Sequence, residues 1–254
     1  MAIVHRIPAF RDNYIWLVAN DHGQCVAIDP GDPQVTISAL KNLQLELVGL
    51  LITHHHHDHI GGINTLSKSF NVPVYGPAHE KIAGVTHTLK EGDHISILPN
   101  VNFDVFDVPG HTAGHIAFYY NNHMFLGDTL FGAGCGRLFD GTAAQLHASL
   151  NKVAALPTST RVYCAHEYTA ANLEFARHVE PGNDAIAQRQ THTLELRSRN
   201  QATVPLNLGE EMLTNPFLRC HLPELRQTVQ NHCGFSLPSA LAVFTELRRW
   251  KDRF

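Results

Sequence analysis

Residues 53–62, THHHHDHIGG, concentrate side chains that bind metals or transfer protons. The apolar run Leu47–Ile52 precedes this segment and predicts a buried strand, so the histidines begin where a strand ends. The pattern H-x-H-x-D-H supplies four ligand-type side chains, which are His54, His56, Asp58 and His59. Residues two apart point to one side of an extended chain, so the first two could bind one ion and the last two another. An accidental run of surface histidines is the competing interpretation.

Three further candidates lie downstream, each after an apolar run that predicts a strand. His111 lies in PGHTAGH, Asp128 in FLGDTLF and His166 in VYCAHEY. Because ligand sites collect at strand ends in layered α/β proteins, these three side chains are expected to join the first four. Imidazole nitrogen and carboxylate oxygen suit zinc or iron in a hydrolytic site. The sequence therefore predicts a metal centre rather than an accidental histidine run.

Apolar runs between turn signals predict the elements that position these ligands. The remaining expected strands are Tyr14–Ala19, Cys25–Ile28, Val72–Tyr75, Ile95–Leu98, Phe103–Val108, His115–Tyr120, His123–Leu126 and Val162–Ala165, the first two forming a hairpin. Helical patterns between them cover Val35–Leu43, Ile63–Phe70 and Thr142–Leu156. Paired strands with helices outside predict an α/β protein with two mixed sheets sandwiched between helices.

After residue 165 the pattern becomes helical and strand signals disappear. Helices are expected at Asn172–Val179, Asp184–Arg199, Pro223–Asn231 and Leu237–Trp250. The segment EPGND, residues 180–184, is a candidate boundary between a mixed α/β part and a helical C-terminal part. We place the domain boundary near residue 170, within about ten residues, which gives domains 1–170 and 171–254.

Composition excludes several classes of protein. The chain has 254 residues, of which 44% are hydrophobic and 17% charged, as expected of a folded protein with a core. A net charge of −4 does not suggest nucleic acid as a partner. The sequence shows no signal-peptide pattern and no long apolar run, so we expect no membrane segment. Five scattered cysteines without a C-x-x-C pair favour a cytoplasmic location and buried, unreactive thiols.

The motifs together resemble the metallo-β-lactamase fold, through HHHHDHIGG, PGHTAGH, LGDTLF and CAHEY. More narrowly, the chain resembles the glyoxalase II family, the hydroxyacylglutathione hydrolases. That resemblance depends on GDTLFGAGCGRLFDGT (127–142), RVYCAHEYTAANLEFARHVEPGN (161–183), NPFLR (215–219) and RRWKD (248–252), which extend it over essentially the whole chain. It implies a four-layer αββα sandwich that carries the metals, followed by a C-terminal helical domain that binds substrate.

The resemblance also implies how the ligands divide. One divalent ion would be held by His54, His56 and His111, and a second by Asp58, His59 and His166, with Asp128 bridging the two. Zinc is the expected metal, and iron and manganese accept the same ligands. His57 and His115 are not ligands in the family pattern, so His57 is expected to pack or to face solvent, and His115 to support the ligands or to pack.

The implied reaction is hydrolysis of S-(2-hydroxyacyl)glutathione, of the S-D-lactoylglutathione type, in methylglyoxal detoxification. Two cations sharing one water would lower its pKa, so that hydroxide attacks the thioester carbonyl while a metal stabilises the oxyanion. Asp58 could also orient the attacking water, and Asp128 would fix the spacing of the ions. A thiolate leaves easily, so no strong general acid is required.

Recognition of the glutathione carboxylates should use cations and a tyrosine. The resemblance indicates four substrate-binding residues, which are Arg137, Tyr168, Arg248 and Lys251. Two positions depart from many relatives, since Arg137 replaces a lysine and Phe139 replaces a tyrosine, which removes one hydroxyl contact. In NPFLR, Asn215 is expected to cap a turn and Phe217 to join the core. We expect a monomer.

Three rival functions remain open. A β-lactamase would need a secretory signal. In such an enzyme, the helical C-terminal part of this chain would have no function. An iron-dependent persulfide oxygenase uses one ion, so a full second ligand set argues against it. A metal-storage protein would need neither a bridging aspartate nor a substrate domain.

Overall fold

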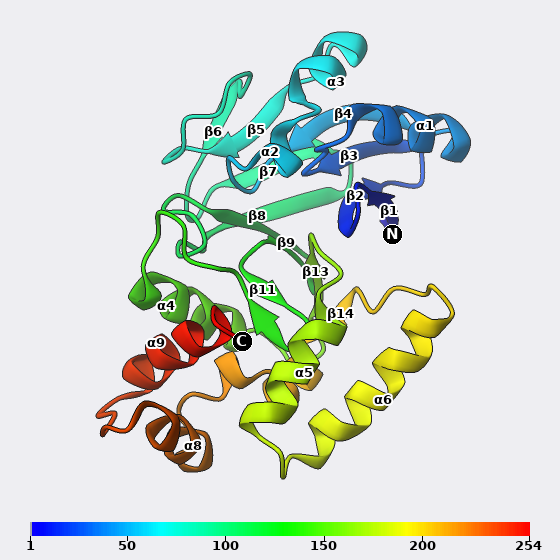
Figure 1. The fold of residues 1–254 in the computed structure, drawn as a ribbon. Helices are drawn as coiled ribbons and strands as arrows, with labels where there is room; N and C mark the ends of the chain where they lie inside the picture. The colour runs from blue at the N-terminus through cyan, green and yellow to red at the C-terminus, as the bar shows by residue number, and fades with distance from the viewer. Residues whose placement is uncertain (1) are drawn as a thin grey trace. The chain divides into compact units, whose positions relative to one another are not determined.

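The computed structural model describes residues 2–254, and the chain divides into two compact units (Figure 1). The first unit runs to Asp107 and includes Thr112–Gly127, and the second comprises Val108–His111 and Asp128–Phe254. A domain boundary near residue 170 stays a prediction.

The first unit contains a mixed sheet in the order β1-β2-β3-β4-β5-β6. Its strands are β1 (Ile3–Ala9), β2 (Asn13–Ala19), β3 (Gln24–Ile28), β4 (Glu46–Leu51), β5 (Val74–Pro77) and β6 (His87–Leu89). The predicted hairpin is confirmed, because β2 and β3 pair antiparallel, whereas β3, β4, β5 and β6 run parallel. β1 and β6, which lie at the two edges of this sheet, were not predicted from the sequence.

A second sheet belongs partly to the same unit, where its order is β10-β9-β8-β7. These strands are β7 (His94–Leu98), β8 (Val101–Asp107), β9 (Ile116–Tyr120) and β10 (His123–Gly127), and neighbouring strands pair antiparallel. The two sheets approach closely, because a Cβ atom placed on Gly49 of β4 would lie 2.3 Å from Ile97 Cδ1 of β7.

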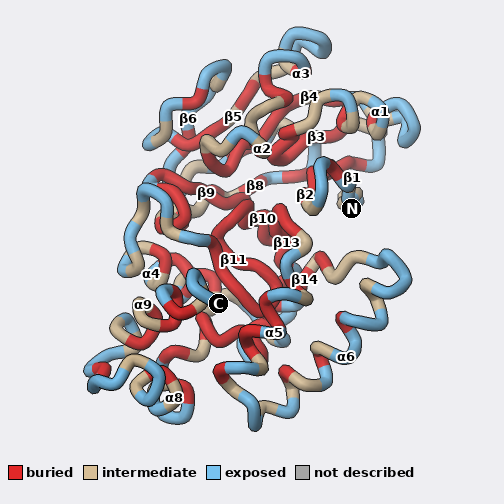
Figure 2. The backbone as a smooth tube through the Cα atoms, viewed as in Figure 1, coloured by how far each residue is buried: buried red, intermediate tan, exposed pale blue. Residues whose placement is uncertain are grey.

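Helices cover the other face of the first sheet. They are α1 (Pro33–Leu43), α2 (His57–Ile60) and α3 (Ile63–Phe70). Alternate residues of β2 and β3, such as Leu17 and Ala27, form one core cluster with Leu40 of α1 and Leu66 of α3. Because both faces of this sheet are covered, β2 is buried along its whole length (Figure 2).

The second unit is mainly helical. Its helices are α4 (Ala143–Ala154), α5 (Thr169–Val179), α6 (Asp184–Ser198), α7 (Leu208–Thr214), the 3-10 helix η1 (Pro216–Leu218), α8 (Pro223–Cys233) and α9 (Ala240–Lys251). Its strands are the hairpin β11 (Leu130–Phe131) and β12 (Gly134–Cys135) and the pair β13 (Arg161–Cys164) and β14 (Leu206–Asn207). The expectation that strands end after residue 165 is wrong, because β14 pairs with β13; two residues are too short to show strand periodicity.

Capping explains where several helices begin. Thr142 and Gln145 form a capping box at α4, and the Asn183 side chain accepts from the backbone at the start of α6. The last helix, α9, begins three residues later than predicted, because the Ser239 side chain caps it by accepting from the Ala242 N–H. Asn215 caps η1 as predicted, and its neighbour Phe217 is buried.

A buried ion pair between α6 and α7 also contacts the β11–β12 hairpin. The fully buried Glu211 carboxylate pairs with Arg189 of α6 and accepts a hydrogen bond from the Ala133 N–H at 2.9 Å. Asn215 Nδ2 donates to the same carboxylate at 2.9 Å and to the Gly134 carbonyl at 2.9 Å. Both charged groups have partners, which is the condition under which a buried charge is tolerated.

Removing one partner of this pair is expected to destabilise the fold strongly. Glu211→Ala leaves the Arg189 charge buried without its main partner, so the free energy of unfolding in urea should fall by about 3–5 kcal/mol. Glu210→Ala is the matched control, because the Glu210 side chain is 48% exposed and lies 3.3 Å from Arg189, and its loss should cost about 0–1 kcal/mol. Equal losses in the two variants would contradict this account.

No helix within residues 2–254 is long and apolar enough to cross a bilayer.

Candidate metal centre

Asp29 organises the histidine segment from the end of β3. The Thr53 hydroxyl donates to Asp29 Oδ2 at 2.7 Å and lies 3.0 Å from His54 Nδ1, while His59 Nδ1 lies 3.0 Å from the same oxygen. Since the hydroxyl proton goes to Asp29, Thr53 accepts the Nδ1 proton of His54, and the Asp29 carboxylate faces His59 Nδ1. Both histidines therefore present Nε2 as the ligand atom, which is how buried carboxylates orient metal-binding imidazoles.

The other histidines of the segment differ in their surroundings. His55 Nδ1 lies 2.8 Å from Glu80, a carboxylate that is 3% exposed and also accepts a hydrogen bond from Thr112. His57 is exposed at the start of α2, as expected of a residue that is not a ligand. His115 is buried and stacks on His54, with ring centroids 4.5 Å apart. That packing role agrees with the prediction for His115.

In the second unit, one oxygen of Asp128 faces two histidines. Asp128 Oδ2 lies 3.5 Å from His111 Nε2 and 3.4 Å from His166 Nε2. His111 donates from Nδ1 to the Arg137 carbonyl at 2.8 Å, so its Nε2 is the available ligand atom. A Cβ atom on Gly136 would lie 2.1 Å from the Asp128 carbonyl, so glycine is required where this backbone packs against the aspartate.

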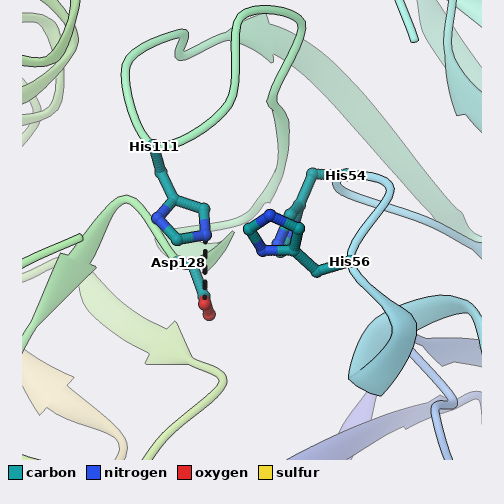
Figure 3. A group of neighbouring side chains, drawn as sticks. All are labelled: His54, His56, His111 and Asp128. Atoms are coloured by element: carbon teal, nitrogen blue, oxygen red, sulfur yellow. Dashed lines mark ion pairs between the residues drawn. The ribbon is translucent and has the colours of Figure 1, made fainter. Parts of the chain in front are cut away.

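Two groups of side chains could each hold a metal ion. In each group the ligand atoms all lie within 4.8 Å of one another, and the groups are His54, His56, His111 and Asp128, and Asp58, His59 and His166. Figure 3 shows the first group, with the side chains directed toward one another and Asp128 paired with His111.

The donor set fits divalent metal ions. A tetrahedral ion with ligands at about 2.1 Å holds neighbouring ligand atoms roughly 3.4 Å apart, close to both distances from Asp128 Oδ2. All seven side chains are imidazoles or carboxylates, and all except His56 and Asp58 are buried. Seven ligands exceed what one tetrahedral ion takes, so the set is suited to two ions.

The four predicted substrate residues lie in the second unit. Tyr168, 37% exposed, stacks on His166 with ring centroids 4.7 Å apart. Burial, followed by the positive charges of Arg248 and then Arg137, lowers the pKa of Lys251, so the three cations influence one another. Arg248 is buried and donates to the Cys135 carbonyl at 3.1 Å, and it pairs with Asp252 at 2.8 Å. It therefore has a structural role, and a role in substrate binding stays a prediction.

Thiol chemistry is excluded near the site. Burial raises the pKa of Cys135 to about 11, although the adjacent Arg248 guanidinium opposes the shift. Burial also raises the pKa of the Cys164 thiol. A nucleophilic cysteine needs a lowered pKa, so the burial of both thiols and the direction of their pKa shifts favour the predicted packing role.

Some functional contacts escaped prediction from the sequence. Asp29 follows the apolar run Cys25–Ile28, so its place at a strand end was the available signal. Glu80 and Asn13, which donates to Asp58 Oδ2 at 2.8 Å, lie outside the motifs, and a single sequence gives no signal for them.

Comparison with known proteins defines the class. The metallo-beta-lactamase superfamily model matches residues 9–166. A crystal structure of the B3 metallo-beta-lactamase BLEG-1 superposes with a TM-score of 0.66 at 27% identity, covering 85% of this chain and 99% of that one. A protein solved in a di-iron-bound form superposes with a TM-score of 0.60 at 26% identity, covering 85% of this chain and 100% of that one. The chain is a member of the metallo-β-lactamase superfamily, and the predicted fold class is confirmed.

The C-terminal part of the chain identifies the family within this superfamily. The model for the hydroxyacylglutathione hydrolase C-terminus matches residues 167–254. A hydroxyacylglutathione hydrolase of Halorhodospira halophila is 51% identical over 97% of each chain. The chain belongs to the hydroxyacylglutathione hydrolase family, as the sequence motifs predict.

Proposed function

We propose that this chain hydrolyses the thioester of S-(2-hydroxyacyl)glutathione to glutathione and a 2-hydroxy acid, using two divalent metal ions. The position of Asp128 Oδ2, near Nε2 of both His111 and His166, carries the metal part of this proposal, because each histidine belongs to a different ligand group. The match of residues 167–254 to the family's own C-terminal model supports the glutathione part.

The seven ligands have separate tasks. His54, His56 and His111 would hold one ion, and Asp58, His59 and His166 would hold the other, with Asp128 available to both. Divalent ions in such a site lower the pKa of water and polarise a carbonyl oxygen. Asp58, the more exposed of the two aspartates, can accept a hydrogen bond from the attacking water and orient it. The thiolate of glutathione departs without a strong acid.

Substrate recognition is assigned to the cationic end of α9 and its surroundings. Arg137, Arg248 and Lys251 bring positive charge together, and glutathione carries two carboxylates. Tyr168 offers a hydroxyl next to His166. Zinc is the proposed metal, and a monomeric, cytoplasmic enzyme without nucleic-acid or membrane partners remains our expectation.

Hydrolysis of a glutathione thioester tests this function directly. The purified protein should remove the thioester absorbance of S-D-lactoylglutathione with the release of glutathione. A β-lactam and glutathione persulfide, the second with oxygen uptake followed, serve as parallel substrates. Turnover of either one in place of the thioester would reject the proposal in favour of that reaction.

Metal content tests the two-ion arrangement. We expect close to two ions per chain by elemental analysis after loosely bound metal is removed, because seven ligands are available in two groups. Chelation should abolish thioester hydrolysis, and zinc should restore it. A fully active protein with a single ion per chain would contradict the bridging role of Asp128.

A further inference from the structure

Asn13 is a buried amide at the beginning of an apolar strand. It is the first residue of β2, NYIWLVA, and only 8% of it is exposed. It pairs with Ala9 across the β1–β2 turn, where Phe10 adopts a φ of 50°. An amide buried among apolar residues needs hydrogen-bond partners, so its contacts indicate its role.

The Asn13 side chain reaches across the unit to Asp58. Its Nδ2 donates to Asp58 Oδ2 at 2.8 Å, although the two residues are 45 positions apart. The backbone fixes this approach at Gly31, where an added Cβ atom would lie 1.8 Å from the Asp58 carbonyl oxygen and 3.0 Å from Phe10. The β1–β2 turn and helix α2 thus pack against the same glycine, which sets the separation of Asn13 and Asp58.

This contact suits a carboxylate that must keep one orientation. The Asp58 side chain is 38% exposed, so packing alone does not hold its carboxylate plane. An amide N–H can donate to a carboxylate and does not itself titrate, so Asn13 remains a donor at every working pH. Such a donor determines the direction in which the carboxylate presents its oxygens to an ion.

We propose that Asn13 is a positioning residue that orients the Asp58 carboxylate toward the ion held with His59 and His166. The proposal rests on the proposed function, because it takes Asp58 to be a ligand of the hydrolytic centre. It extends that function to the β1–β2 turn, which contains none of the motif residues.

Asn20 provides a matched control on the same strand system. It follows β2 at the opposite end, is 6% exposed, and accepts hydrogen bonds through Oδ1 from the His22 and Gln24 N–H groups at 3.0 Å. These contacts shape the β2–β3 turn and do not involve a ligand candidate. Asn20→Ala therefore removes a buried asparagine of similar structural importance without touching Asp58.

The test compares metal affinity in the zinc-loaded full chain. For Asn13→Ala, competition with a chelator should show one of the two ions bound roughly 10–100-fold more weakly and the other unchanged. The kcat for S-D-lactoylglutathione should fall by a similar factor, with KM changed less than about threefold. Asn13→Asp, which places a second carboxylate against Asp58, should lose at least as much affinity. Asn20→Ala should retain both affinities and kcat, whatever its melting temperature.

Two outcomes would overturn the inference. One is wild-type affinity for both ions and wild-type kcat in folded Asn13→Ala; the other is an equal loss of affinity in Asn20→Ala, which would make the effect one of general stability. Because the affinity measurement requires no substrate, it judges Asn13 even if the wild-type chain fails to hydrolyse the thioester. That failure would reject the proposed substrate, whereas the metal-affinity measurement alone would still decide the role of Asn13.

Discussion

Replacing Asp128 with alanine is expected to remove metal from both ligand groups and to lower kcat/KM for a glutathione thioester about 10³-fold or more. Asp128 Oδ2 lies within 3.5 Å of Nε2 of both His111 and His166, so its loss affects both ions. A metal ion contributes several kcal/mol to stabilising charge in the transition state, and each 1.36 kcal/mol is tenfold in rate. Elemental analysis and steady-state kinetics on the same preparation measure both effects.

His57→Ala is the control for this variant. His57 belongs to the same dense run of histidines but is exposed at the first turn of α2. Its replacement should leave two ions per chain and kcat/KM within about twofold, since exposed substitutions change stability by only about 0.5 kcal/mol. If His57→Ala lost metal as completely as Asp128→Ala, the division of ligands between the two groups would be wrong.

The seven candidate metal ligands can be found from the sequence because their types and their places at strand ends are both visible there. His111, Asp128 and His166 each follow a strand that the apolar pattern predicts, and the structure places all three in ligand groups. Asp29 was harder to predict, because a carboxylate after a strand can also cap a helix or face solvent. Only the hydrogen bond from the Thr53 hydroxyl and the 3.0 Å distance to His59 Nδ1 connect Asp29 to two of the imidazoles.

The strands of the fold also differ in whether the sequence alone predicts them. Strands buried on both faces, such as β2, read as continuous apolar runs and were predicted within one or two residues. The edge strand β1, IVHRIPA, mixes polar and apolar residues and has only one buried residue, so its pairing with β2 decides its structure. β11, β12 and β14 contain two residues each and depend on tertiary hydrogen bonds, such as those from Asn215 to the β11–β12 hairpin. Periodicity cannot detect elements of that length.

Of the two α9 residues predicted to bind glutathione, Arg248 and Lys251, the second is better suited to testing this prediction. Arg248 donates to the Cys135 carbonyl and pairs with Asp252, so Arg248→Ala should raise KM but also destabilise the fold. Lys251 is only partly buried, and its ammonium lies over the rings of Phe175 and Phe254, 5.2 and 5.5 Å from their centroids. Methionine preserves most of that packing while removing the charge.

Lys251→Met is therefore expected to raise KM for glutathione thioesters roughly tenfold or more, with kcat changed much less and metal content unaffected. A charge-assisted hydrogen bond contributes about 1.5–3 kcal/mol, and a tenfold change in affinity corresponds to about 1.4 kcal/mol. The contact is assigned to the glutathione carboxylates rather than the reacting carbonyl, so it should stabilise bound substrate and transition state alike. A thioester without those carboxylates should show no difference between the variant and the wild type. Unchanged KM in folded Lys251→Met would remove Lys251 from the substrate site.

The pH dependence of KM gives an independent check on Lys251. Burial and the neighbouring Arg248 lower the pKa of Lys251 from its usual value of 10.5, so the ammonium loses its charge at a lower pH than an ordinary lysine. If the charged form binds substrate, KM should rise as the pH increases through that lowered pKa. Lys251→Arg keeps its charge over the same range, because the guanidinium pKa lies above about 12, and should flatten the rise. Titration of the substrate ammonium affects both proteins equally, so the difference between their profiles isolates residue 251. Superimposable profiles would show that the charge of Lys251 does not contribute to binding.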